Sequence, residues 1–149
     1  MADGNNKTGG IIMSRKMARE TAMKLIYQMD MQSSNSNDTL NLYFENVKND
    51  IKEDDKSYIS NCLHGVEGNL KIIDGYIEKY ARGWKINRIG KVELAILRRS
   101  IYEMLYINDI PRAVSINEAV DIAKKYCGSE SPSFINGILD SVLKEIERA

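Results

Sequence analysis

Apolar residues recur along most of the chain at spacings of three and four, which is the period of an α-helix. From Ser14, a residue type that caps helices, the pattern predicts a first helix that runs to about Asp30. A short second helix, capped by Asp38, is predicted over residues 40–51. After an acidic turn, the apolar seam over residues 59–80 predicts one long helix that packs along another helix.

Three glycines interrupt this long predicted helix, at positions 65, 68 and 75, and each costs about 1 kcal/mol relative to Ala. We therefore expect either a close approach of another helix or a bend in this segment. The stretch "ARGWKINRIG" that follows is predicted to be a connector with one helical turn. Residues 91–107 are apolar on nearly every side, which predicts a helix at the centre of the fold, covered on both flanks and ended by Pro111.

Two further helices are predicted near the C-terminus. Ser115 with Glu118 three residues later forms a capping box for the first of them. Ser131 is the predicted N-cap of the second, with Pro132 at its first helical position. No segment shows sustained period-two alternation, so the sequence predicts an all-α fold of six or seven helices over residues 14–149. The length suits one compact domain with one core, or two small sub-bundles that share it.

The first residues, 1–13, are polar and glycine-rich, and we interpret them as a disordered leader or a remnant of cloning. No apolar run reaches the length of a membrane span, and the N-terminus lacks a signal-peptide core. The two cysteines, Cys62 and Cys127, are too few and too far apart to indicate a disulfide framework or a zinc site. A reducing, cytoplasmic location is the expectation from this cysteine usage.

Positive and negative charges balance at 21 each, so a surface for nucleic acid would have to be a local patch. The charges do segregate, with cations at residues 15–24 and 82–99 and an acidic stretch between them. Solvated helix faces are the ordinary explanation of such runs. A catalytic interpretation has little support, because the chain has no glycine-rich phosphate loop, no metal-ligand spacing and only one histidine. We expect a half-buried, structural His64, and neither a catalytic residue, a metal site nor a cofactor.

Three sets of side chains are candidates for binding. Arg15, Lys16 and Arg19 form a compact cationic cluster at the start of the first helix, a geometry that suits phosphates. Met23 and Tyr27 fall on the solvent side of the same helix, which indicates either a partner surface or two isolated exposed residues.

Phe134 lies in the first turn of the last helix, off its apolar stripe. Its ring could stack on an unpaired base while nearby backbone N–H groups meet a phosphate. Alternatively, the ring packs under the loop "GSESPS" that precedes it.

Three segments together resemble the NusB family of transcription antitermination factors: "RKMARETAMKLIYQMD", "RIGKVELAILRRSIYEMLYINDIPRAVSINEAVDIAKKY" and "FINGILD". The resemblance covers nearly the whole chain from Ser14 onward. It implies an all-α fold of about seven helices, with two three-helix bundles packed together and an extra short helix. It also implies a protein without enzymatic activity that binds the boxA element of ribosomal RNA transcripts together with NusE, a small-subunit ribosomal protein. Within the RNA polymerase antitermination complex, it would promote read-through of terminators.

The resemblance assigns roles to several of the candidate residues. It places Arg15, Lys16 and Arg19 in the arginine-rich RNA-binding N-terminus of the family and Phe134 at its RNA-contacting aromatic. The loop before this ring adds Glu130 and Ser133 to the RNA-binding set, and Ser133 stands where many members have a lysine. Residues that face NusE in the family correspond to Tyr27 and Glu93 here, and we add Met23 as the neighbour of Tyr27.

Two other functions remain open at this point. One is a NusB-like RNA-binding domain of the kind found at the front of some ribosomal RNA methyltransferases, although we expect no such enzyme because no glycine-rich cofactor fold follows in the 149 residues. The other is a helical adaptor that binds only protein. Affinity for a boxA-like RNA, measured with and without NusE, separates this adaptor from an antitermination factor.

Overall fold

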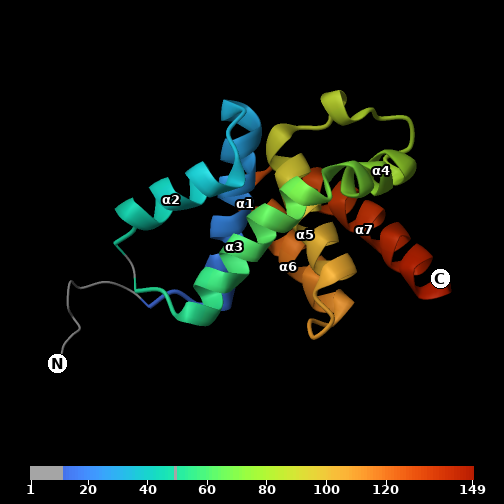
Figure 1. Ribbon diagram of the computed structural model, residues 1–149. Helices are drawn as coiled ribbons and strands as arrows, with labels where there is room; N and C mark the ends of the chain where they lie inside the picture. Colours follow the sequence, from blue (N-terminus) through green and yellow to red (C-terminus); the bar gives the residue numbers. More distant parts are fainter. Residues whose placement is uncertain (1–11, 49) are drawn as a thin grey trace. The chain divides into compact units, whose positions relative to one another are not determined.

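The structure is a computed structural model, which describes residues 12–48 and 50–149 (Figure 1). Its described residues form helices throughout, apart from connecting loops and one isolated parallel bridge between Ile12 and Asp50. The helices are α1 (Arg15–Gln32), α2 (Ser36–Asn46), α3 (Glu53–Gly68), α4 (Leu70–Tyr80), the 3-10 turn η2 (Ile86–Arg88), α5 (Lys91–Tyr106), α6 (Arg112–Tyr126) and α7 (Ser131–Arg148). The prediction of an all-α fold is confirmed.

The chain divides into two compact units, Met1–His64 and Gly65–Ala149, here called the N-terminal unit and the C-terminal unit. Each is described by itself. A predicted leader at residues 1–13 lies mostly outside the described residues and stays a prediction there. Met13 belongs to the folded part, because it is buried and its N–H donates to the Asp50 carbonyl at 2.9 Å.

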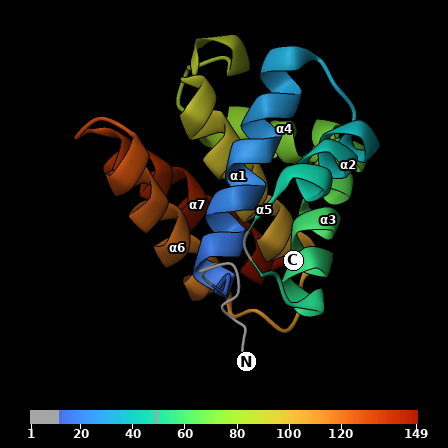
Figure 2. The ribbon, with the colours of Figure 1, turned by 90° about the vertical axis from the view of Figure 1, so that its left-hand side faces the viewer.

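In the N-terminal unit, α1 packs against α2, and local hydrogen bonds set where each helix begins (Figure 2). Ser14 caps α1 as predicted, with its hydroxyl accepting the Met17 N–H at 3.1 Å. The predicted cap of α2 was wrong, since Asn35 rather than Asp38 takes that position. Its side-chain oxygen accepts the Asp38 N–H at 2.8 Å, so the helix starts three residues earlier and Asp38 lies in its first turn.

The single long helix predicted over residues 59–80 is two helices, α3 and α4, with a break at Asn69. Gly68 has low helix propensity, and the Asn69 side chain donates to the Gly65 carbonyl at 2.8 Å, which together end α3. The expected bend is therefore confirmed, while one continuous helix was wrong. The expected close approach is also found, because a Cβ atom at Gly65 would overlap the Tyr102 ring of α5.

Helix α5 lies at the centre of the C-terminal unit, where it contacts α4, α6 and α7 (Figure 1). Every residue from Leu94 to Met104 is buried, as the all-round apolar pattern predicted. Three of these buried residues carry charge, Arg98, Arg99 and Glu103. Arg99 Nη1 pairs with Glu103 Oε2 at 2.8 Å, and Arg98 Nη2 pairs with Asp74 Oδ2 of α4 at 2.8 Å. The predicted apolar stripe of α7 was Ile135, Ile138, Leu139, Val142 and Ile146. The first four are buried, and Ile146 is half-buried.

Two predicted caps in the C-terminal unit were wrong because their hydroxyls have tertiary partners. Helix α6 begins at Arg112 after Pro111, so Ser115 lies inside it and is buried. The Ser115 hydroxyl donates to the Glu103 carboxylate at 2.7 Å. Ser131 is the first residue of α7 rather than its cap, and its hydroxyl donates to the Glu93 carboxylate at 2.6 Å. In the part of the chain that the structure describes, no helix is both long and apolar enough to cross a membrane.

Candidate functional site

The predicted cations of the N-terminal unit gather at the start of α1, where they meet side chains of α3. Arg15 Nε donates to Asp55 Oδ1 at 2.7 Å, and its guanidinium lies 4.7 Å from the centre of the Tyr58 ring. The Arg19 guanidinium lies over the same ring at 5.8 Å. Both arginines thus share one aromatic platform, a cation–π arrangement that holds them together.

Exposure differs sharply among the three cations. Lys16 is exposed and Arg15 is half-exposed, whereas Arg19 is only 7 % exposed. The predicted compact cluster is confirmed for the two arginines over Tyr58, and Arg19 is the more buried of the two. Nothing in the local sequence pointed to Asp55 or Tyr58, which lie about forty residues away along the chain. RNA contact by the cations stays a prediction.

Tyr27 and Met23 were predicted to share the solvent side of α1. Tyr27 is half-buried, but Met23 is 2 % exposed, so its placement on an exposed partner surface was wrong. The buried side of α1 is wider than the predicted stripe and comprises Ala18, Arg19, Ala22, Met23, Leu25, Ile26 and Met29. With both Arg19 and Met23 buried one turn apart, only Tyr27 of the predicted pair remains available to a partner.

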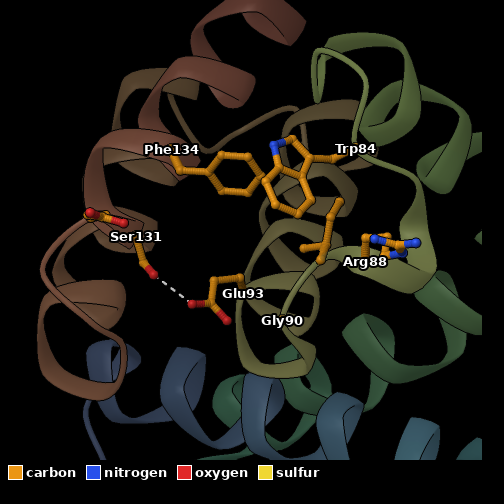
Figure 3. Close-up of a pocket in the computed structure, with 8 residues that line it drawn as sticks. Trp84, Arg88, Gly90, Glu93, Ser131 and Phe134 are labelled. Atoms are coloured by element: carbon orange, nitrogen blue, oxygen red, sulfur yellow. Dashed lines mark hydrogen bonds between the residues drawn. The ribbon is translucent and has the colours of Figure 1, made fainter.

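The C-terminal unit contains a cavity of about 210 Å³, which we call the aromatic hollow. Its lining residues are Trp84, Arg88, Ile89, Gly90, Glu93, Glu130, Ser131 and Phe134. Figure 3 shows the Trp84 and Phe134 rings pointing toward each other, with Glu93 and Ser131 below them. Three predicted binding residues therefore line one cavity, with Glu93 from the start of α5 and Glu130 and Phe134 from the start of α7.

Each wall of the hollow is held by a different element. The first turn of α7 supplies Phe134, whose backbone N–H donates to the Glu130 carbonyl at 3.3 Å. Contact of nearby N–H groups with a phosphate stays a prediction. Trp84 comes from the connector between α4 and α5. A turn places it there, with Arg82 and Gly83 in the left-handed region (φ 49° and 89°) and the Trp84 N–H donating to the Ala81 carbonyl at 3.1 Å.

Glu93, in the first turn of α5, is fixed by Ser131 of α7 and by Gly90, the residue that precedes α5. It accepts a hydrogen bond from Ser131, and Gly90 allows the carboxylate to lie against the backbone, since a Cβ there would overlap it. The pKa of the nearby Cys127 thiol is raised to about 11, mainly by burial and next by the negative charge of Glu93. The sequence resemblance assigned Glu93 to the NusE surface, whereas the structure groups it with Phe134; contact of Glu93 with NusE stays a prediction.

Exposure supports part of the predicted RNA-binding set in this unit. Glu130 and Ser133 are exposed, and Phe134 is half-buried. The candidate residues chosen from the sequence did not include Trp84 and Arg88, which also line the hollow. The tryptophan among the cations of "RGWKINR" was a signal that could have indicated them.

The predictions for His64 and the cysteines had mixed outcomes. His64 is exposed, so the predicted half-burial was wrong, but its Nδ1 lies 2.9 Å from the Ser36 hydroxyl, a partner that holds the ring. Both cysteines are of a residue type expected in the core; Cys62 is buried there, and Cys127 is only half-buried. Over residues 12–48 and 50–149, no group of three or more His, Cys, Asp or Glu side chains is arranged to hold a metal ion.

Comparison with known proteins places the chain among its relatives. A model of the NusB family matches residues 16–144. The transcription antitermination protein NusB of Acetivibrio thermocellus is 52 % identical over 132 residues, which cover 89 % of this chain and 90 % of the relative. The solved structure of T. maritima NusB is similar with a TM-score of 0.81 at 32 % identity, covering 91 % of this chain and 94 % of that one.

A crystal structure of the antitermination factors NusB and NusE in complex with dsRNA also contains a similar chain. Its TM-score is 0.77 at 27 % identity, and the match covers 88 % of this chain and 96 % of that one. Since the family model spans most of the molecule, including both units, the chain belongs to the NusB family.

Proposed function

We propose that the protein is a transcription antitermination factor that binds boxA RNA of ribosomal RNA operons together with NusE and promotes read-through by RNA polymerase. One observation carries the proposal: the chain is similar over 88 % of its length to a factor crystallised with NusE and dsRNA. The protein acts by binding, without chemistry of its own, and works in the cytoplasm where transcription takes place. An aromatic cavity beside exposed cations is a surface suited to nucleic acid.

The proposed contacts divide between the two units. Phe134 stacks on a base of the RNA, and Ser133 and Glu130 contact the same strand beside it. Lys16 and Arg15 bind RNA phosphates, because they are the exposed and half-exposed cations at the start of α1. NusE binds at Tyr27, the half-buried aromatic of α1.

Replacing Phe134 tests the proposal at its most specific residue. Base stacking on an aromatic is worth about 1–3 kcal/mol, so Phe134→Ala should weaken binding of a single-stranded boxA RNA by that order. Phe134→Trp should retain most of the affinity, because its π-face is preserved. Fluorescence anisotropy of labelled RNA, with and without NusE, measures both variants, and urea unfolding checks that they remain folded.

Two comparisons in the same experiment separate the remaining functions. A double-stranded RNA of the same sequence should bind more weakly than the single strand, since paired bases cannot enter between side chains. An adaptor that binds only protein would bind NusE and show no affinity for either RNA. If wild-type protein binds no boxA RNA even with NusE present, the proposed function is wrong.

A further inference from the structure

We propose that Trp84 and Phe134 together hold one unpaired RNA base in the aromatic hollow, with Trp84 as a base-stacking residue that no sequence pattern assigned. The inference rests on the proposed function, because it identifies which part of the RNA this cavity takes. It adds a second aromatic to Phe134, and it defines the occupant as a single base rather than a protein side chain or a phosphate.

Both rings are placed to receive a flat ligand. Trp84 is 53 % exposed and points toward Phe134 in Figure 3. The same two rings also line a second cavity of about 310 Å³ with Arg82 and Ser133, so solvent reaches the pair from both sides. Exposed indoles with one apolar face are typical of binding surfaces, because their large area is gained at little entropic cost.

The size of the hollow restricts its occupant. Its volume of about 210 Å³ lies below the roughly 300–1,000 Å³ of pockets that enclose drug-sized ligands. The hollow accommodates one planar ring system rather than a whole helix or strand. The exposed cations of the connector, Arg82, Lys85 and Arg88, favour the base of a polyanion over the aromatic side chain of a protein. A single base is therefore the expected occupant, with its neighbours in the RNA remaining outside.

The charges around the hollow indicate how the nucleotide is oriented. From residue 82 to residue 91 the sequence carries four cations and no acidic residue, and the side chains of Arg82, Lys85 and Arg88 are exposed. The wall opposite carries the carboxylates of Glu93 and Glu130. Cations attract the phosphates and carboxylates repel them, so the base enters and the backbone stays along the connector.

The connector is held in place before any ligand arrives. The turn at Arg82 and Gly83 is closed by the hydrogen bond from the Trp84 N–H, and the 3-10 turn η2 follows directly. A non-glycine residue in the left-handed region is uncommon and persists only where the surrounding structure determines it. The backbone that carries the indole is therefore already in place, and a base that stacks on it need not order the connector.

Trp84 is the only tryptophan in the chain, so its fluorescence reports on the hollow directly. Titration with single-stranded boxA RNA should quench the emission of the full-length protein in parallel with binding measured by anisotropy. Trp84→Ala should weaken this binding roughly 5- to 150-fold, the range for loss of one stacked base. Trp84→Phe should lose the fluorescence signal but keep affinity within a few-fold of wild type.

A matched control is Tyr106→Ala, which removes another exposed aromatic of the same unit, 42 % exposed at the far end of α5. Along the helix axis it lies roughly 20 Å from Glu93, at 1.5 Å per residue. This variant should bind RNA as wild type does.

An abasic scan identifies the base itself. One nucleotide of the RNA at a time is replaced by an abasic unit, and each RNA is titrated into wild-type protein and Trp84→Ala. A single position should weaken wild-type binding strongly and Trp84→Ala binding much less, because the variant has already lost that contact.

The outcomes distinguish the base-holding role of Trp84 from the proposed antitermination function on which it rests. RNA binding that leaves the Trp84 emission unchanged and survives Trp84→Ala overturns the base-holding role and keeps the proposed function. Loss of NusE binding in Trp84→Ala without RNA present also overturns it, since the hollow would then be a protein site. Absence of RNA binding by wild-type protein with NusE overturns both.

Discussion

The start of α1 and the connector before α5 carry similar cationic sequences, yet their charges are used differently. In α1, Arg15 pairs with Asp55 at 2.7 Å and Arg19 is buried over Tyr58. In the connector, Arg82 and Arg88 are exposed beside an aromatic cavity. The arginines of α1 partly serve to hold α1 against α3, whereas the arginines of the connector extend into solvent.

The difference teaches that charge density in a sequence does not measure affinity for phosphate. Asp55 is 2 % exposed, and a buried carboxylate needs a partner, so the fold itself requires Arg15. The charge of a cation that faces solvent is not neutralised by a carboxylate of the protein, so it is fully available to a phosphate of the ligand. We therefore expect substitutions in α1 to mix stability with binding and substitutions at the connector to affect binding alone.

The largest expected effect is the loss of NusE binding on substitution of Tyr27 in α1. It tests whether α1 binds the protein partner while the connector binds RNA. Tyr27→Asp places a charge where an interface would exclude water, which commonly costs several kcal/mol when the charge is unpaired. We expect NusE binding to be lost or greatly weakened, while direct RNA binding by the isolated protein is nearly unchanged. Calorimetric titration with NusE measures the first, and RNA anisotropy the second. Tyr27→Phe is the control, and wild-type NusE affinity in Tyr27→Asp would contradict the role of Tyr27.

The next effect concerns stability and compares two neighbours in α1. Arg15→Ala leaves the buried Asp55 carboxylate without its partner, a loss that generally costs about 1–3 kcal/mol. Because 40 % of the Arg15 side chain is exposed, water compensates in part, and we expect roughly the lower end, near 1 kcal/mol. Lys16→Ala, which is exposed, should change the free energy of unfolding little. Urea unfolding measures both, and equal stabilities would mean that the Arg15–Asp55 pair does not stabilise the fold.

Helix content was predictable from the sequence because it depends on local period. The helix around Leu94 to Met104 carries apolar residues on both faces, and every residue of this run is buried, including the charged Arg98, Arg99 and Glu103. Helix starts were predicted less well, since Ser115 and Ser131 have capping side chains whose hydroxyls donate to Glu103 and Glu93 instead. A serine hydroxyl can bond either to the backbone N–H groups at the start of its helix or to a side chain that is distant in sequence. The sequence alone does not show which of these groups lies nearby.

The candidate site was predictable where one residue carries a recognisable role and not where distant residues combine. Phe134 was found from its position off the apolar stripe, and it does line a cavity. Trp84 was passed over as part of a connector, because its pairing with Phe134 depends on how α7 lies against α4 and α5. The Arg15–Asp55 contact was equally hidden, with forty residues between its members.

A smaller effect concerns the salt dependence of RNA binding and sharpens the comparison between the two regions. Each cation that contacts a single-stranded RNA phosphate contributes roughly 0.7 to the log–log salt slope. We expect Arg88→Ala and Lys16→Ala each to flatten the slope by about that amount. Arg19→Ala should leave it unchanged, because this side chain is buried. Affinities measured from low to moderate salt give the slopes, and a flattened slope in Arg19→Ala would show that the buried arginine reaches the RNA.

The smallest effect tests whether the carboxylate of the hollow is held in place as its hydrogen bonds indicate. The pKa of Cys127 is about 11 rather than 9.0, because of burial first and the charge of Glu93 second. Only the thiolate reacts with iodoacetamide, so native Cys127 should alkylate slowly at pH 9. Glu93→Gln removes the negative charge and should lower this pKa, which raises the rate at pH 9, although burial keeps the midpoint above the ordinary value.

Ser131→Ala is the matched variant with the opposite sign. The Ser131 hydroxyl lowers the pKa of Cys127, so its removal should raise the pKa and slow the alkylation at pH 9. Mass spectrometry of the labelled peptides separates Cys127 from the buried Cys62 and gives both rates as a function of pH. Equal rates in wild type, Glu93→Gln and Ser131→Ala would mean that the Glu93 carboxylate does not face Cys127, and that the acidic wall that keeps phosphates out of the hollow lies elsewhere.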